Sequence, residues 1–134
     1  MARRLILDTT VLVTAERGTV RLGGLLEDAD DVAIAAITAA ELLVGVELAD
    51  VARRDTRRAF VEDVLATIPV EEYDLDVARA HARLLAHVRR TGTPRGAHDL
   101  IIAATATATG RTVVTADATG FEQLPDVAVL GALR

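Results

Sequence analysis

The sequence predicts an α/β protein, a three-layer α/β/α sandwich with a central, mainly parallel sheet. Three short apolar runs, each too brief for a helix, are typical of strands buried on both faces: Leu5–Leu7, Val32–Ile37 and Thr112–Thr115. Segments with helical spacing separate these runs, and strands that alternate with helices form parallel sheets flanked by helices. Because 51% of the residues are hydrophobic but only 2% are aromatic, we expect a core of Ala, Val, Leu and Ile.

The intervals between the strands carry helical patterns. Before the middle of the chain, we expect helices over residues 10–16, 20–28, 38–50 and 51–67. The run Ile68–Tyr73 is broken by a proline, which favours a weak strand at an edge of the sheet. Asp74 or Asp76 caps the clearest helix of the chain, a second helix covers 97–109, and a final strand covers 127–130.

Several residue types are missing, and their absence excludes whole classes of site. The chain has no Lys, Ser, Asn or Cys, and all 15 of its basic residues are Arg. A P-loop needs its Lys and a nucleophile elbow needs Ser or Cys, so both are excluded. A Gly-x-Gly-x-x-Gly fingerprint is also missing. Titratable chemistry is left to carboxylates, three His, one Tyr and the arginines.

Charge and hydropathy place the protein in a broad class. The net charge of −5 argues against a basic surface overall, but leaves room for a local nucleic-acid groove. No apolar run approaches the length of a membrane span, and the first residues do not form a signal peptide. With no linker, repeat or low-complexity segment, we expect a soluble, cytoplasmic protein with one domain over residues 1–134.

Four acids are expected to meet at one edge of the sheet. Asp8, Glu41 and Asp117 each follow the carboxyl end of a predicted strand, and Asp99 opens a helix that must start near the same edge. Four carboxylates without a Lys would repel one another, which a bound cation would relieve. Oxygen ligands favour Mg²⁺ or Mn²⁺, and an acidic site with such an ion is the usual apparatus of phosphodiester hydrolysis.

Each acid alone also has a structural explanation. Asp8 can cap the next helix, and Thr38-x-x-Glu41 has the spacing of a capping box. Asp99 lies in the first turn of a helix, where the dipole favours a carboxylate, and Asp117 can be an ordinary turn residue. The common placement of the four, rather than any one of them, indicates a site.

Other polar residues receive weaker assignments. Arg95 lies just before Asp99 and is a candidate contact to RNA phosphate at the rim of the site. His98 should point about 100° away from Asp99 on the helix, and we leave it out of the site. His81 falls on an apolar helix face, which favours a core histidine. The double arginine stripe of residues 53–58 favours a solvated face paired with Asp50 and Glu62, with RNA contact as the alternative.

Four segments together resemble a known family. They are Leu7–Leu12, Thr38–Gly45, His98–Ala106 and Thr115–Phe121. In this order they look like the PIN domain, and in particular like the VapC-type toxins of bacterial toxin–antitoxin pairs. The resemblance extends over nearly the whole chain. It implies a metal-dependent ribonuclease that forms a homodimer and is inhibited by a small antitoxin protein.

The resemblance also implies roles for individual residues. The core acids would be Asp8, Glu41 and Asp99. Asp117 would be the fourth acid, which holds metal-bound water or the metal itself. Thr115 matches a hydroxyl that supports the site, and Thr10 stands where the family most often has Ser.

Other classes of function stay open beside this one. A haloacid-dehalogenase-type phosphatase needs a second Asp where Thr10 stands, and both it and a phospho-receiver domain need a Lys. A PIN-like scaffold that binds without cutting is the non-enzyme alternative, and the four acids argue against it. A DNA-directed nuclease is a further alternative, because the preference for RNA comes from the resemblance alone.

Overall fold

The structure is a computed structural model that describes residues 2–18 and 21–131. Its sheet is built from five strands: β1 (Arg4–Leu7), β2 (Asp31–Ala35), β3 (Val70–Glu71), β4 (Thr112–Thr115) and β5 (Val129–Gly131). They lie in the order β3-β2-β1-β4-β5, and every neighbouring pair is parallel. The predicted parallel sheet is therefore confirmed, and the strand interrupted by Pro69 lies at its edge as expected.

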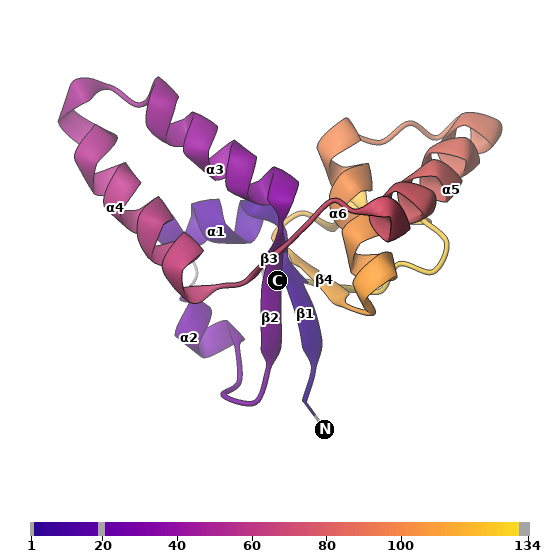
Figure 1. The fold of residues 1–134 in the computed structure, drawn as a ribbon, viewed down its shortest axis with the longest axis horizontal. Coiled ribbons are helices and arrows are strands. Elements are labelled where there is room, and N and C mark those ends of the chain that lie inside the picture. The colour runs from indigo at the N-terminus through magenta and orange to yellow at the C-terminus, as the bar shows by residue number, and fades with distance from the viewer. Residues whose placement is uncertain (1, 19–20, 132–134) are drawn as a thin grey trace.

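The helices cover both faces of this sheet. They are α1 (Thr9–Glu16), α2 (Leu22–Leu25), α3 (Ala36–Leu48), α4 (Val51–Thr67), α5 (Leu75–Thr91) and α6 (Ala97–Thr109), with a short 3₁₀ turn, η1 (Ala118–Gly120). Figure 1 shows α3 and α4 on one side of the strands and α5 and α6 on the other. This is the predicted three-layer α/β/α architecture. Among the described residues, no helix is both long and apolar enough to cross a membrane.

The central strand explains why the apolar runs are continuous. Leu5 and Leu7 pack into the core on the α3–α4 side, whereas Ile6 packs into the core under α5 and α6. Alternate residues of a strand point to opposite faces, so a strand covered on both sides needs an apolar residue at every position. Val113 and Val114 of β4 divide between the two cores in the same way.

Two helices differ from their predicted ranges. The helix expected over 20–28 is only the four-residue α2, since Gly23 and Gly24 are poor helix formers; its predicted start at Val20 lies outside the described residues. Helix α3 begins two residues before Thr38, directly after β2, and its N-cap is Ala35, which makes no side-chain cap. The predicted capping box is therefore wrong.

A buried arginine connects three strands, with its contacts to β1 and β2 near the amino ends of those strands. Arg111, whose side chain is 5% exposed, donates from Nη1 to the carbonyl oxygens of Leu5 at 3.2 Å and Asp31 at 2.9 Å. Its Nη2 pairs with Glu71 of β3 at 3.2 Å. A permanent cation thus joins β1, β2 and β3 beside the start of β4, while the acids discussed next lie where the strands end.

Candidate active site

Asp8 is the most deeply buried of the four acids, at 3% exposure. It follows β1 directly, and its Oδ2 accepts hydrogen bonds from the hydroxyls of Thr10 and Thr115, each at 2.8 Å. Each hydroxyl in turn accepts from a backbone N–H, that of Ala116 or that of Asp117. The two threonines therefore fix one oxygen of Asp8 and leave its Oδ1 free of hydrogen bonds within the described part of the chain.

Glu41 contacts two side chains that we did not predict to belong to the site. Its Oε1 accepts from the hydroxyl of Thr9 at 2.7 Å, and its Oε2 lies 3.1 Å from Nδ1 of His98. The prediction that His98 points away from the site was wrong. Helix α3 packs against α6, so a side chain that leaves α6 at an angle to Asp99 reaches Glu41.

The pKa of Asp99 responds to the other three acids. It lies half-buried in the first turn of α6. Burial raises the pKa of its carboxyl, and the charges of Asp8, Glu41 and Asp117 raise that pKa further, while His98 acts in the opposite direction. Asp8, Glu41 and Asp117 are therefore close enough to Asp99 to act on its carboxyl, as the predicted common placement of the four acids expects.

A glycine makes room for the Asp99 carboxylate. A Cβ atom built on Gly120 would overlap Oδ2 of Asp99 and crowd its Cγ, so a larger residue there would displace the carboxylate. Gly120 belongs to η1, which follows β4 at the same edge of the sheet. Sequence reasoning missed this residue, because a single glycine in a turn is ordinary without the position of Asp99.

Asp117 is the most exposed of the four acids. Its Oδ1 accepts from the backbone N–H of Thr119 at 3.1 Å and from the Thr119 hydroxyl at 2.6 Å, and these bonds lower the pKa of Asp117. In this arrangement Asp117 caps η1, as its structural alternative expects. Its charge nevertheless acts on Asp99, so it lies at the rim of the same site.

The acids share an edge without forming a closed ligand shell. Within the described ranges, no three His, Asp or Glu side chains converge closely enough to hold one ion. Glu41 is turned toward Thr9 and His98, and the carboxylate of Asp117 is turned toward Thr119. The donors themselves, all carboxylate oxygens, fit a hard divalent ion.

Arg95 is anchored to the loop in which it lies. Its guanidinium donates to the carbonyl oxygens of Thr93 at 3.2 Å, Pro94 at 3.1 Å and Glu122 at 2.8 Å. These bonds join the loop before α6 to the segment after η1. A contact from Arg95 to RNA phosphate stays a prediction.

The chain as a whole has counterparts among known proteins. Residues 5–127 match the PIN domain family. This chain belongs to the PIN-domain family. The resemblance stated from the four sequence segments is therefore confirmed over nearly the whole chain.

The similar proteins are VapC-type PIN domains. The chain is 37% identical to "Ribonuclease VapC5" of Mycobacterium tuberculosis, over 84% of its own length and 82% of that protein. It superimposes on a chain of DNA-bound VapBC from Salmonella typhimurium with a TM-score of 0.86 and 28% identity, covering 98% of both chains. The VapBC-5 toxin-antitoxin structure from M. tuberculosis gives a TM-score of 0.78 and 32% identity, again over 98% of both.

Proposed function

We propose that this PIN domain is an Mg²⁺- or Mn²⁺-dependent endoribonuclease and the toxin of a toxin–antitoxin pair. The observation that carries the proposal is the half-buried position of Asp99 beside Asp8, Glu41 and Asp117, where burial first and then these three charges raise its pKa. Its relatives support the choice of RNA, because the similar M. tuberculosis protein is named a ribonuclease. Neither a phosphatase nor a receiver domain fits, since the chain has no Lys.

Each residue of the site has a distinct task in this proposal. Asp8, Glu41 and Asp99 would hold the ion, and Asp117 at the rim would contact it only indirectly. When bound, such an ion activates water for attack and neutralises charge on the phosphate. Thr10 and Thr115 fix Asp8, while Thr9 and His98 orient Glu41. Gly120 leaves the space that the Asp99 carboxylate occupies.

A cleavage assay tests the catalytic part of the proposal. Labelled single-stranded RNA should be cut internally in Mg²⁺ or Mn²⁺ and left intact in EDTA, and Asp99→Asn should stop cleavage without unfolding the protein. Single-stranded DNA of the same sequence tests the DNA-directed alternative. A folded wild-type protein that cuts neither substrate in either metal would leave only the binding scaffold.

We further propose a small antitoxin as the protein partner and a homodimer as the toxin's own assembly. Similar structures are described as toxin–antitoxin complexes. In this chain, Val44, Leu48 and Val51 are exposed by 53%, 81% and 85% along α3 and the start of α4, which suits a protein interface. An antitoxin Arg that entered the acidic site would form charge-assisted bonds to the carboxylates and compete with the metal.

The proposed partner is tested by expressing this protein together with the product of a small reading frame that neighbours its gene. The purified complex should be inactive, and Asp99→Asn should weaken the association as well as catalysis. Light scattering on the toxin alone reports the dimer. A complex that cuts RNA as fast as the free toxin would overturn this mechanism of inhibition.

A further inference from the structure

Helix α5 presents a row of exposed arginines on its outer side. Arg79, Arg83 and Arg90 are spaced at i, i+4 and i+11, which places them on one side of the helix. That side is turned away from the core, into which Val77 and Leu84 are buried. The row extends over about 16 Å, at 1.5 Å for each residue of a helix.

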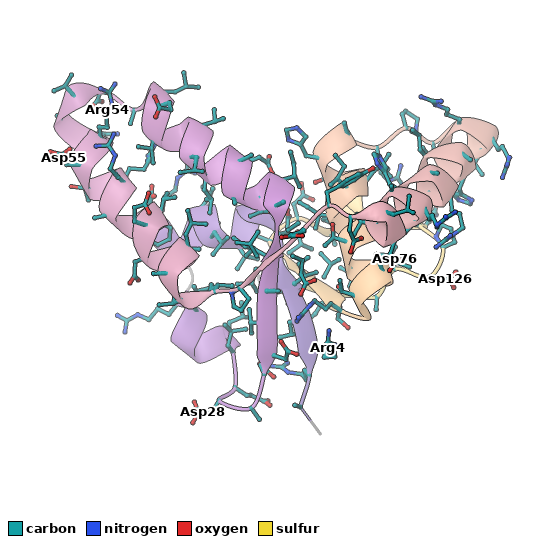
Figure 2. The ribbon with its side chains drawn as sticks, viewed as in Figure 1. Arg4, Asp28, Arg54, Asp55, Asp76 and Asp126 are labelled. Carbon is teal, nitrogen blue, oxygen red and sulfur yellow. The ribbon has the colours of Figure 1, made fainter. Side chains whose placement is uncertain are left out.

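The charge of this row is not neutralised within the described part of the chain. Its arginines form no ion pair there, and Asp76 in the first turn is the one acid within the helix. Figure 2 shows Asp76 at the start of α5, across the molecule from Arg54 and Asp55 on α4.

Helix α4 uses its arginines differently. Arg57 pairs with Glu16 at 3.2 Å and Arg58 with Asp55 at 3.5 Å, partners other than the predicted Asp50 and Glu62. Arg54 donates to the carbonyl oxygen of Ala49 at 2.8 Å. Two of the four α4 arginines are therefore paired with acids, although not with the predicted ones, whereas the arginines of α5 form no ion pair among the described residues.

A hollow of about 320 Å³ lies at the C-terminal end of α5. Leu85, Val88 and Leu100 give it an apolar lining, and Arg89 and Arg95 also line it. A nucleotide has matching chemistry, because its base offers a flat apolar face and its phosphate pairs with guanidinium groups. The guanidinium of Arg95 is already bonded to three backbone carbonyls and its Nε is buried, so the exposed Arg89, which forms no ion pair among the described residues, supplies the available positive charge at the hollow.

The hollow adjoins the acidic site. Asp99 and Leu100 are consecutive in the first turn of α6, one among the acids and the other in the lining of the hollow. The loop that joins α5 to α6 has five residues, 92–96, and can span at most about 17 Å. Figure 1 shows this loop running from the end of α5 to the start of α6.

We infer that the hollow holds one nucleotide of a single-stranded RNA and that the outer face of α5 binds the sugar-phosphate backbone of the same strand, on one side of the cleavage site. The inference rests on the proposed nuclease function and adds a path for the RNA. From the acidic site, the RNA would pass over the 92–96 loop to Arg89, and then along α5 past Arg90, Arg83 and Arg79. Positive charge here offsets the repulsion between RNA and the four acids, and it steers the substrate toward them.

The test compares two pairs of arginines. Arg83→Gln/Arg90→Gln removes two charges from α5, and Arg53→Gln/Arg58→Gln removes two exposed charges from α4. Binding of a fluorescein-labelled single-stranded oligoribonucleotide is measured by anisotropy in EDTA over a range of salt concentrations. EDTA prevents metal-dependent cleavage, so the result does not depend on the nuclease activity. Circular dichroism melts establish that both variants are folded.

The α5 variant should weaken RNA binding several-fold, and its log–log salt slope should become shallower by about 1.4, which is about 0.7 for each phosphate deprived of its arginine. The α4 variant should keep the wild-type slope. Equal weakening in both variants would show an effect of net charge alone, and an unchanged α5 variant would remove the binding surface; either result overturns the inference. An α5 variant that binds RNA normally but no longer binds a protein partner would assign the row to that partner instead.

A parallel assay separates this inference from the proposed function. If the wild type cuts RNA in Mn²⁺, the α5 variant should show a raised KM for long RNA with kcat unchanged. If the wild type cuts nothing, the nuclease proposal fails, while the anisotropy comparison still decides whether α5 binds RNA.

Discussion

At the scale of single residues, four carboxylates at one edge behave differently because their neighbours differ. Asp8 is buried and fixed by two hydroxyls, whereas Asp117 is exposed and has a lowered pKa because Thr119 donates to it. Asp99 has a raised pKa, since it is half-buried among the other charges. The pKa values of Asp99 and Asp117 therefore shift in opposite directions because their surroundings differ, although both residues are aspartates.

Replacing Glu41 by Gln tests it as a ligand. The two side chains have nearly the same shape, so the melting temperature should stay close to that of the wild type. A neutral amide is a poor ligand for a hard dication, so cleavage should fall by at least about 100-fold and Mn²⁺ should raise the melting temperature less. Glu47→Gln, on the exposed side of α3, is the matched control. A folded Glu41→Gln variant that cuts RNA at the wild-type rate would remove Glu41 from the site.

Thr9 is expected to act through Glu41. Thr9→Val removes the hydroxyl that donates to Oε1 at 2.7 Å but keeps the shape of the side chain. Loss of such a supporting bond typically weakens metal binding about 10- to 100-fold. Calorimetric titration with Mn²⁺ measures the change, and Thr9→Ser should restore affinity. Thr14→Val removes another hydroxyl of the same helix, one that bonds to backbone carbonyls, and should leave metal binding unchanged.

Gly120 offers a steric test of the position of Asp99. In Gly120→Ala, the new methyl group would meet the Asp99 carboxylate, so the carboxylate must move and cleavage should fall sharply. The control is Gly23→Ala, because a Cβ on Gly23 meets nothing within 4 Å. The RNA cleavage rate and the melting temperature are measured for both variants. If the two variants cut RNA at the same rate, the Asp99 carboxylate can move without any loss of cleavage activity.

At the scale of elements, helix ends decide where the site residues lie. Helix α5 starts at a side-chain cap, in which Asp74 accepts from the N–H of Val77 at 2.9 Å, and it ends at Gly92 with φ of 67°. Helix α3 has no side-chain cap and starts directly after β2. Thr38 is therefore inside the helix and buried, and Glu41 is free to turn toward α1 and α6.

The cap of α5 has a measurable energy. Asp74→Ala should destabilise the protein by about 1 kcal/mol, the usual cost of losing an N-cap. Asp76→Ala, in the first turn, should cost only about 0.3–1 kcal/mol, because it removes a dipole interaction and no cap. Urea unfolding of both variants compares these costs. A larger loss for Asp76→Ala would identify Asp76 as the more important residue at this helix start.

At the scale of the whole molecule, the charges at the two ends of β1 and β2 are compensated differently: Arg111 pairs with Asp31 and Glu71, whereas the four acids of the site form no ion pair with an arginine among the described residues. Arg111 lies buried near the starts of β1 and β2, and the acids lie where the strands end. Repulsion among the acids opposes folding when no cation is bound. Millimolar Mg²⁺ or Mn²⁺ should therefore raise the melting temperature, as does any ligand that binds only the folded state.

The raised pKa of Asp99 gives this repulsion a pH dependence with a definite sign. Because the folded-state pKa lies above the unfolded one, the folded protein binds more protons between the two values. The contribution of Asp99 to stability therefore decreases as pH rises through that window, and it is unfavourable at neutral pH. Measured in EDTA, Asp99→Asn should be more stable than the wild type at neutral pH, with a smaller difference in acid.

A surface acid provides the control for this measurement. Asp28→Asn removes an exposed charge far from the strand ends that carry the site, and it should show no such pH-dependent gain. Urea unfolding at a series of pH values gives the free energy of each variant relative to the wild type. If Asp99→Asn is less stable than the wild type at neutral pH, the carboxylate stabilises the fold and repulsion is not dominant.

Local patterns in the sequence were enough to predict the fold and the four acids. The apolar runs of β1 and β4 need burial on both faces whatever surrounds them, and the cap at Asp74 depends on residues of its own turn. Asp8, Glu41 and Asp117 come after strands along the chain, Asp99 opens the helix that precedes β4, and parallel strands end at one edge, so their common placement also follows from the order of elements.

Only the tertiary structure decided what surrounds those acids. Thr9 meets Glu41 across 32 positions of the chain, and His98 reaches the same carboxylate from α6 because α3 packs beside that helix. Gly120 matters only because η1 approaches Asp99. Such contacts depend on which elements pack together and at what angle. No residue carries that information in its own neighbourhood of the sequence, so it emerges only when the layers assemble.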